Sequence, residues 1–279
     1  MLAKSLKNLL PALSEDEIVE VTKLHSLGEH TIINNPIVDR PFRSPHHTAS
    51  RVSIIGGGSK VQPGEISLAH RGVLFLDELL EYPRTILESL RQPLEDHEIT
   101  VSRANGKFNF PANFLLVATM NPCPCGFLGD PEKTCVCSQN QIINYQKRLS
   151  GPLLDRIDLT VSVSRVPHEK LLNNKMSTKS QQETFLSEIH KAYSIQRDRY
   201  KCSYKYNNDI PSNGVDKITS ISESAKTFLT NAARKLDLST RSYFKVIKVS
   251  RTIADLEGSA SIEIPHIAES LQYRQISIG

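Results

Sequence analysis

The stretch GVLFLDELLEYP, residues 72–83, decides the fold of this chain. Its four large apolar residues, 73–76, follow one another without a polar residue, as in a strand that is buried on both faces of a parallel sheet. Asp77 and Glu78 come immediately after them. Ligands bind beyond the carboxyl ends of strands in open α/β sheets, so the acidic pair is a candidate magnesium and nucleotide site. A strand that merely ends in a charged turn would give the same pattern.

Two further apolar runs extend this pattern. Residues 114–119, FLLVAT, predict a second buried strand with Asn121 just beyond it, and residues 159–163, LTVSV, predict a third. Asn121 could orient a water, although an asparagine before proline is also a common turn residue. Buried strands that alternate with helices predict an α/β fold with a parallel sheet covered on both sides.

Residues 99–110 predict a β-hairpin that turns at Asn105 and Gly106, because Asn-Gly is the strongest short hairpin signal. Arg103 and Lys107 flank this turn and are candidate contacts for DNA phosphates. A charged, solvated hairpin end is the alternative interpretation. The pairing should place four apolar residues on one face: Ile99, Val101, Phe108 and Phe110.

The character of the sequence changes beyond about residue 165. Residues 180–200 predict a long polar helix, and three more helices are expected to begin near Ser222, Ser239 and Pro265. Gly258 should end the middle one of these three. We therefore expect an α/β core over residues 1–165 and a helical domain over residues 166–279, with the boundary at 164–167.

Composition narrows the function only slightly. The 279 residues contain 34 Lys and Arg against 30 Asp and Glu, and the net charge of +4 permits contact with nucleic acid without requiring it. No apolar stretch approaches the roughly 18 to 20 residues of a membrane span, and the first residues lack the features of a signal peptide. We expect a cytoplasmic protein without a membrane partner.

Four of the five cysteines form a C-x-C-x9-C-x-C pattern. Two pairs of thiolates suit a structural, tetrahedral zinc ion, although C-x-C is tighter than the usual spacing within a pair. Small buried or free thiols and redox pairing are the alternatives. The candidate metal ligands are Cys123, Cys125, Cys135 and Cys137.

Taken together, the motifs resemble those of the magnesium-chelatase-like AAA+ proteins of the YifB/ComM group. The resemblance covers about residues 1–274. It rests on RPFRSPHHTAS (40–50), PGEISLAHRGVLFLDEL (63–79), LVATMNPCPCG (116–126), SGPLLDRIDL (150–159) and VSRTIADLEG (249–258). It implies a P-loop ATPase core with a parallel sheet, followed by a helical lid, and ATP and Mg²⁺ as cofactors of the complete protein.

The resemblance also implies a role for each candidate site residue. Asp77 matches the Walker B aspartate that binds magnesium, while Glu78 and Asn121 would position the attacking water. Arg156 matches the arginine finger that reaches a neighbouring subunit's nucleotide, and Arg241 matches the sensor 2 arginine of the lid. Without the resemblance, each arginine would be interpreted as an ordinary surface or helix residue, with Arg156 paired to a neighbouring aspartate.

A Walker A loop, G-x-x-x-x-G-K-[ST], is missing from the 279 residues. Residues 56–60, GGGSK, lack its spacing and are interpreted as a loop. The resemblance implies that Met1 stands just past the phosphate loop, so that the core lacks its first strand. We therefore expect that this chain alone neither binds ATP tightly nor hydrolyses it, because no lysine or amide nest faces Asp77.

The function that the resemblance implies is that of a hexameric ATPase acting on DNA, similar to the branch-migration helicases that assist recombination in natural transformation, or competence. Two alternatives remain open from the sequence. One is an ATPase subunit of a magnesium chelatase, and the other is a non-catalytic remnant that lends Arg156 to an intact neighbour.

Overall fold

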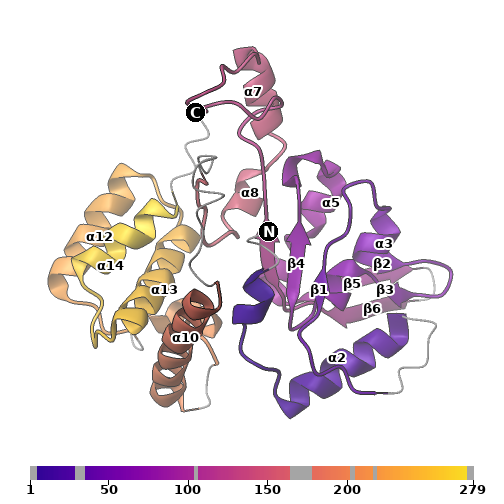
Figure 1. Cartoon of the computed structure of the whole chain (residues 1–279), viewed down its shortest axis with the longest axis horizontal. Helices are drawn as coiled ribbons and strands as arrows, with labels where there is room; N and C mark the ends of the chain where they lie inside the picture. The colour runs from indigo at the N-terminus through magenta and orange to yellow at the C-terminus, as the bar shows by residue number, and fades with distance from the viewer. Residues whose placement is uncertain are drawn as a thin grey trace. The chain divides into compact units, whose positions relative to one another are not determined.

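The structure, a computed structural model, describes residues 5–28, 35–103, 106–163, 178–201, 205–215 and 219–274 of the chain. It consists of two compact units, Met1–Arg156 and Ile157–Ile278, which are coloured from indigo to pink and from pink to yellow in Figure 1. The expected boundary at 164–167 lies outside the described residues. Within the described part, none of the helices combines the length and the apolar character that crossing a bilayer requires.

A parallel sheet forms the centre of the first unit. Its strands are β1 (Phe42–Arg43), β4 (Val73–Leu76) and β7 (Leu115–Ala118), in the order β1-β4-β7. β1 and β4 are labelled side by side in Figure 1. All four residues of β4 are buried, so an uninterrupted apolar run is the sequence that its position requires. The predicted α/β fold and the two strands expected at 73–76 and 114–119 are confirmed.

β1 was not predicted, because it is only two residues long and lies between polar residues. It is held against β4 by a hydrogen bond from the Val73 amide to the Pro41 carbonyl oxygen, 2.8 Å long. Gly72 makes this approach possible. A Cβ atom at position 72 would lie 2.0 Å from the same Pro41 oxygen, so any other residue there would push the two strands apart.

Short helices surround this sheet. α2 begins with a capping box, in which the Ser14 amide donates to Glu17 and the Glu17 amide donates to the Ser14 hydroxyl. Leu74 and Leu76 pack with Leu24 in the main core cluster. The helices of this unit are α2 (Glu15–Gly28), α3 (Arg51–Ile55), α4 (Glu65–Leu68), α5 (Arg84–Ser89), α6 (Pro93–Asp96), α7 (Gln139–Gln146) and α8 (Gly151–Leu154), with 3₁₀ turns η1 (Leu6–Leu9) and η2 (Leu79–Glu81).

Two antiparallel hairpins complete the first unit. Residues of the GGGSK segment form a small hairpin, β2 (Gly56–Gly57) with β3 (Gln62–Pro63), in agreement with its interpretation as a loop. The predicted larger hairpin is β5 (Glu98–Arg103) with β6 (Gly106–Pro111). Its register places the four predicted apolar residues on one face, because Ile99 lies opposite Phe110 and Val101 opposite Phe108.

The turn of this larger hairpin differs from the prediction. Gly106 pairs with Arg103 and already belongs to β6, while residues 104 and 105 lie outside the described residues. Gly106 has a φ of 138°, a conformation that side chains disfavour. The glycine is therefore used in the strand and not at the second turn position.

The second unit is helical and agrees closely with the expectation. Its helices are α10 (Thr178–Tyr200), α12 (Glu223–Lys235), α13 (Thr240–Glu257) and α14 (Ile264–Gln272), with 3₁₀ turns η3 (Asn207–Asp209) and η4 (Ser212–Gly214). Ser222 and Ser239 cap the amino ends of α12 and α13, and Gly258 ends α13 in the left-handed conformation. Val246, Ile247 and Leu229 lie in its apolar core.

The prediction of a strand at residues 159–163 is wrong. Within the described residues this segment belongs to no sheet, and its apolar side chains are exposed: Leu159 by 51%, Val161 by 63% and Val163 by 75%. The Thr160 amide donates instead to the Tyr273 carbonyl at the end of α14, 2.8 Å away. The apolar alternation is present, but within the described residues no neighbouring strand completes a ladder.

In the first unit, β7 also has an exposed apolar side chain, because Leu115 is 44% exposed.

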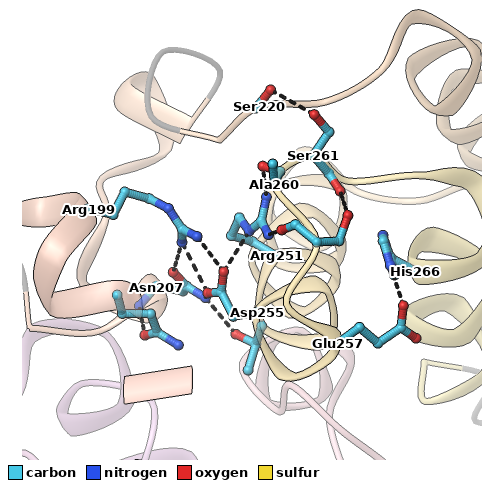
Figure 2. Close-up of polar contacts among 12 residues, drawn as sticks. Arg199, Asn207, Ser220, Arg251, Asp255, Glu257, Ala260, Ser261 and His266 are labelled. Atoms are coloured by element: carbon cyan, nitrogen blue, oxygen red, sulfur yellow. Dashed lines mark hydrogen bonds and ion pairs between the residues drawn. The ribbon is translucent and has the colours of Figure 1, made fainter. Parts of the chain in front are cut away.

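A buried polar network joins three elements of the second unit (Figure 2). Asp255 on α13 accepts hydrogen bonds from Arg199 on α10, from Arg251 one turn earlier on α13, and from Asn207 on η3. Arg251 also donates to the Ala260 carbonyl, 3.0 Å away, just beyond the helix. Since Arg251 and Asp255 are each 1% exposed, these bonds replace the hydration that burial removes.

Candidate functional site

The acidic pair lies at the carboxyl end of the central strand. Asp77 and Glu78 directly follow β4, and both are exposed to solvent at that edge of the sheet. Asn121 follows the neighbouring strand β7, which runs parallel to β4 with Leu76 opposite Ala118. The parallel register therefore carries the carboxylates and the exposed amide to the same edge of the sheet.

Thr119 connects the ends of the two strands. Its hydroxyl donates to a carboxylate oxygen of Asp77 and accepts the amide hydrogen of Glu78, with an N–O distance of 3.1 Å. Its carbonyl oxygen accepts from the Leu79 amide at 2.8 Å. Thr119 was not predicted as a site residue. Its position directly after the β7 apolar run was the available signal, because that position lies beside Asp77 in a parallel register.

Glu78 adopts an unusual backbone conformation. Its φ of 53° and ψ of 54° lie in the left-handed region, which is rare for a residue that is not glycine. Such strain costs free energy and persists where the surroundings fix it, often at functional sites. Here the hydrogen bonds that the amides of Glu78 and Leu79 donate to Thr119 fix it.

A second feature that was not predicted is the approach of His47 to the acidic pair. Its Nδ1 atom lies 3.5 Å from Oε2 of Glu78, and its ring stands edge-on to the ring of Tyr82. Burial, assisted by the negative charge of Asp77, raises the pKa of Tyr82 to about 12. Tyr82 is therefore neutral and donates its hydroxyl hydrogen to the Pro45 carbonyl, 2.6 Å away.

The two predicted arginines lie in different units. Arg156 follows α8 in the first unit, where its Nη2 atom lies 3.1 Å from Glu95 Oε2 and its Nη1 atom donates to the Pro152 carbonyl at 2.7 Å. Its side chain is 12% exposed. Arg241 lies in the first turn of α13 in the second unit.

The four cysteines that the sequence singled out come together. One sulfur from each of Cys123, Cys125, Cys135 and Cys137 lies within 4.8 Å of the others, and Cys123 is buried. The sulfur–sulfur distance is 3.4 Å for Cys123–Cys125 and 3.6 Å from Cys135 to each of those two. Tetrahedral zinc with bonds of about 2.3 Å requires about 3.8 Å between sulfurs, so this donor set fits such an ion.

The thiols of the cluster differ in acidity: the pKa of Cys125 is lowered, whereas those of Cys135 and Cys137 are raised. Hydrogen bonds from the backbone of Phe127 and Val136 lower the pKa of the Cys125 thiol to about 6. This thiol is therefore a thiolate at neutral pH, and thiolates are the form that binds metal. For Cys137, burial raises the pKa, so a bound ion would have to displace its proton.

The predicted DNA-contact residues lie at the end of the larger hairpin. Lys107 is exposed on β6, opposite Ser102. Arg103 ends β5, and its backbone pairs with Gly106; its side chain lies outside the described part of the structure.

Comparison with known proteins covers both units. The family described as magnesium chelatase, subunit ChlI, matches residues 1–171, and the family of the C-terminal part of that subunit matches residues 177–274. The chain is 44% identical over 275 residues to the competence protein ComM of Haemophilus influenzae, covering 98% of this chain and 53% of that protein. It is 38% identical over 277 residues to YifB of Salmonella typhimurium, covering 99% and 53%.

A shorter match, 31% identical over 113 residues, is to the archaeal Lon protease of Methanocaldococcus jannaschii, covering 40% of this chain and 14% of that protein. The chain spans about half the length of ComM and YifB. The two family matches together span nearly all of the chain. This chain therefore belongs to the magnesium chelatase subunit ChlI family of AAA+ ATPases and, within it, to the ComM and YifB group.

Proposed function

We propose that the edge of the sheet beyond β4 and β7 is the nucleotide site of an ATPase that acts on DNA. The observation that supports this most strongly is the parallel register that carries Asp77, Glu78 and Asn121 to one edge. In this proposal Asp77 would hold a magnesium ion, which would neutralise negative charge on the phosphates of ATP. Glu78 accepts a proton from the attacking water, and Asn121 orients that water.

Arg156 acts in this proposal across the interface of a hexameric ring. Within one chain its guanidinium contacts Glu95 and the Pro152 carbonyl. As an arginine finger it exchanges Glu95 for the phosphates of a neighbouring subunit, a contact worth about 10³ to 10⁵ in rate where it operates. Arg241, on the helical unit, serves as the second arginine that senses the nucleotide.

The phosphate-binding half of the site must come from a loop that the 279 residues do not contain. No G-x-x-x-x-G-K-[ST] string occurs in the sequence, and the glycines of residues 56–58 belong to the β2–β3 hairpin. We propose that these residues by themselves do not hydrolyse ATP, because the phosphates would meet carboxylates without a compensating lysine. Magnesium-dependent ATP turnover by the purified chain would contradict this.

DNA is the polymer that we propose as the substrate, for branch migration during recombination in natural transformation. The support is the exposed Lys107 at the end of the larger hairpin and the similarity to ComM, which is named as a competence protein. Fluorescence anisotropy with a DNA duplex tests the contact. Lys107→Ala should weaken binding and reduce its salt dependence, whereas Lys23→Ala, an exposed lysine on α2, should change neither.

The match to a chelatase subunit favours a second candidate, an ATPase that drives magnesium insertion through partner subunits. ATPase assays on a longer form that includes a phosphate loop separate the two. Stimulation by DNA supports the first function, and stimulation by a porphyrin-binding partner supports the second. If that form is inactive alone but changes the turnover of an intact relative when mixed with it, the non-catalytic remnant is supported.

We also propose that the four-cysteine cluster binds one zinc ion with a structural role. The support is the number of thiols, their sulfur separations and the acidic thiol of Cys125. Bound zinc supplies a closed set of four bonds. The cluster begins two residues after Asn121, so the ion would fasten the loop that follows β7.

A further inference from the structure

The segment of residues 45–49 is fastened to the chain just beyond the acidic pair. The Tyr82 hydroxyl donates to the Pro45 carbonyl at 2.6 Å, and the Ala49 amide donates to the His46 carbonyl at 2.9 Å. The ring of His46 hydrogen-bonds the Thr48 hydroxyl at 2.8 Å. Tyr82 is itself buried, with 3% exposure. The segment therefore has a fixed conformation against residues that follow β4.

Within this segment, the ring of His47 is held on two sides. Its centroid lies 4.1 Å from that of His46, with planes 34° apart, and 6.2 Å from that of Tyr82, with planes 79° apart. The second arrangement is an edge-to-face contact, which aromatic rings favour. These contacts direct Nδ1 of His47 toward Glu78 Oε2, 3.5 Å away.

Glu78, in contrast, has a backbone that is fixed by hydrogen bonds and a side chain that is exposed to solvent. Its amide is bonded to the Thr119 hydroxyl, and its backbone is left-handed. Its side chain is 53% exposed. A carboxylate on such a side chain samples several rotamers unless a neighbour selects one. His47 is placed to select it.

We infer that His47 is a positioning residue for Glu78: its imidazole fixes the direction of the carboxylate that activates water. The inference deepens the proposed function, because it rests on the role proposed for Glu78. An exposed pair of this kind contributes little to folding stability. Its loss should therefore appear in the chemistry and leave the unfolding transition unchanged.

The contact itself can be tested on the 279-residue chain without ATP. Glu78→Gln should shift the imidazole nitrogen NMR resonances of His47 and leave those of His190, an exposed histidine on α10, unchanged. The melting temperature should stay the same. Unchanged His47 resonances would overturn the inference, whatever the outcome of any ATPase assay.

The consequence is tested by turnover in a longer form that includes a phosphate loop. His47→Ala should lower kcat by about tenfold or more with KM unchanged, because a misdirected base affects only the chemical step. His47→Gln, which keeps a hydrogen-bond donor, should restore part of that loss. His190→Ala should be neutral.

The outcomes distinguish the positioning role of His47 from the proposed function of the site. If the wild type of the longer form turns over ATP but His47→Ala does so equally fast, the positioning role is wrong and the proposed function stands. If that wild type shows no turnover under any condition, the proposed function fails, and the positioning role in water activation fails with it. A perturbed His47 resonance would then establish a structural contact alone.

Discussion

The hydroxyl of Thr119 donates a hydrogen bond to the carboxylate of Asp77. The same oxygen accepts the amide hydrogen of Glu78, so one residue after β7 restrains both acids after β4. Thr119→Val keeps the shape and removes both bonds, and should lower the free energy of unfolding by about 1 kcal/mol, a modest loss because the site is exposed. Thr119→Ser keeps the hydroxyl and should retain most of the stability in urea titrations. Equal losses for the two variants would contradict the role of the hydroxyl.

Zinc analysis of the purified chain should give one ion per chain. Cys135→Ser should abolish stoichiometric binding, because three thiolates leave the tetrahedral set incomplete. With zinc at about 1,000 times its dissociation constant, binding stabilises the folded chain by about 4 kcal/mol, so a chelator should lower the melting temperature. Cys202→Ser is the control, since Cys202 lies outside the C-x-C-x9-C-x-C run. Full zinc content in Cys135→Ser would refute the assigned ligand set.

The network in Figure 2 provides a matched pair of carboxylates on one helix. Asp255 is fully buried between two arginines, whereas Glu257 pairs with His266 and is 58% exposed. Asp255→Asn leaves the buried guanidinium of Arg251 without a counter-charge and should cost about 3 to 5 kcal/mol of unfolding free energy. Glu257→Gln should cost less than about 1 kcal/mol. Chemical denaturation measures both, and similar losses would show that burial does not control the difference.

His70 should make the stability of the first unit depend on pH. It is 4% exposed, and burial lowers its pKa even though a hydrogen bond with Glu20 opposes the shift. Its Nδ1 atom accepts the Asn113 amide hydrogen at 3.0 Å, so Nε2 carries the proton that faces Glu20 at 3.2 Å. The other charges that affect it are Arg71, which also lowers the pKa, and Glu17, which raises it.

The sign of this dependence follows from proton uptake. The unfolded chain takes up a proton near the ordinary histidine pKa of about 6.5, and the folded chain only at lower pH. The stabilisation is therefore complete above about pH 6.5 and falls as the pH drops below it, by at most about 1.4 kcal/mol per pH unit. His70→Gln should flatten the pH dependence of urea unfolding between about pH 5 and 7. The exposed His190→Gln should leave it unchanged, and a steep dependence that persists in His70→Gln would assign it to other groups.

The elements that could be predicted from the sequence are those whose signal is local. The run of residues 73–76 required a strand buried on both faces, and the capping serines Ser222 and Ser239 marked two helix starts correctly. The cysteine spacing indicated a cluster that the structure brings together. Each of these follows from residues close together in the chain, where propensity and hydrogen bonding act without tertiary context.

The features that were missed depend on partners distant in sequence. β1 forms because Gly72 lets the backbone of Pro41 come close to β4. The two residues of β1 themselves, Phe42 and Arg43, carry no signal of this approach. The His47–Glu78 contact joins a loop to a strand end through the geometry of Tyr82. Residues 159–163 fail as a strand for the opposite reason: the local pattern is present, and a neighbour that would complete the ladder is absent from the described part of the chain.

β7 has a practical consequence for anyone who purifies this chain. Within the described residues it pairs on one side only, with β4, and Leu115 shows 44% of its surface to water. An unpaired strand edge of this kind promotes aggregation, because a strand of another molecule can form hydrogen bonds with its free amide and carbonyl groups. Particle sizes from light scattering should therefore grow with protein concentration. A specific ring should keep a constant mass when the protein is diluted, whereas aggregates that form through the β7 edge should not.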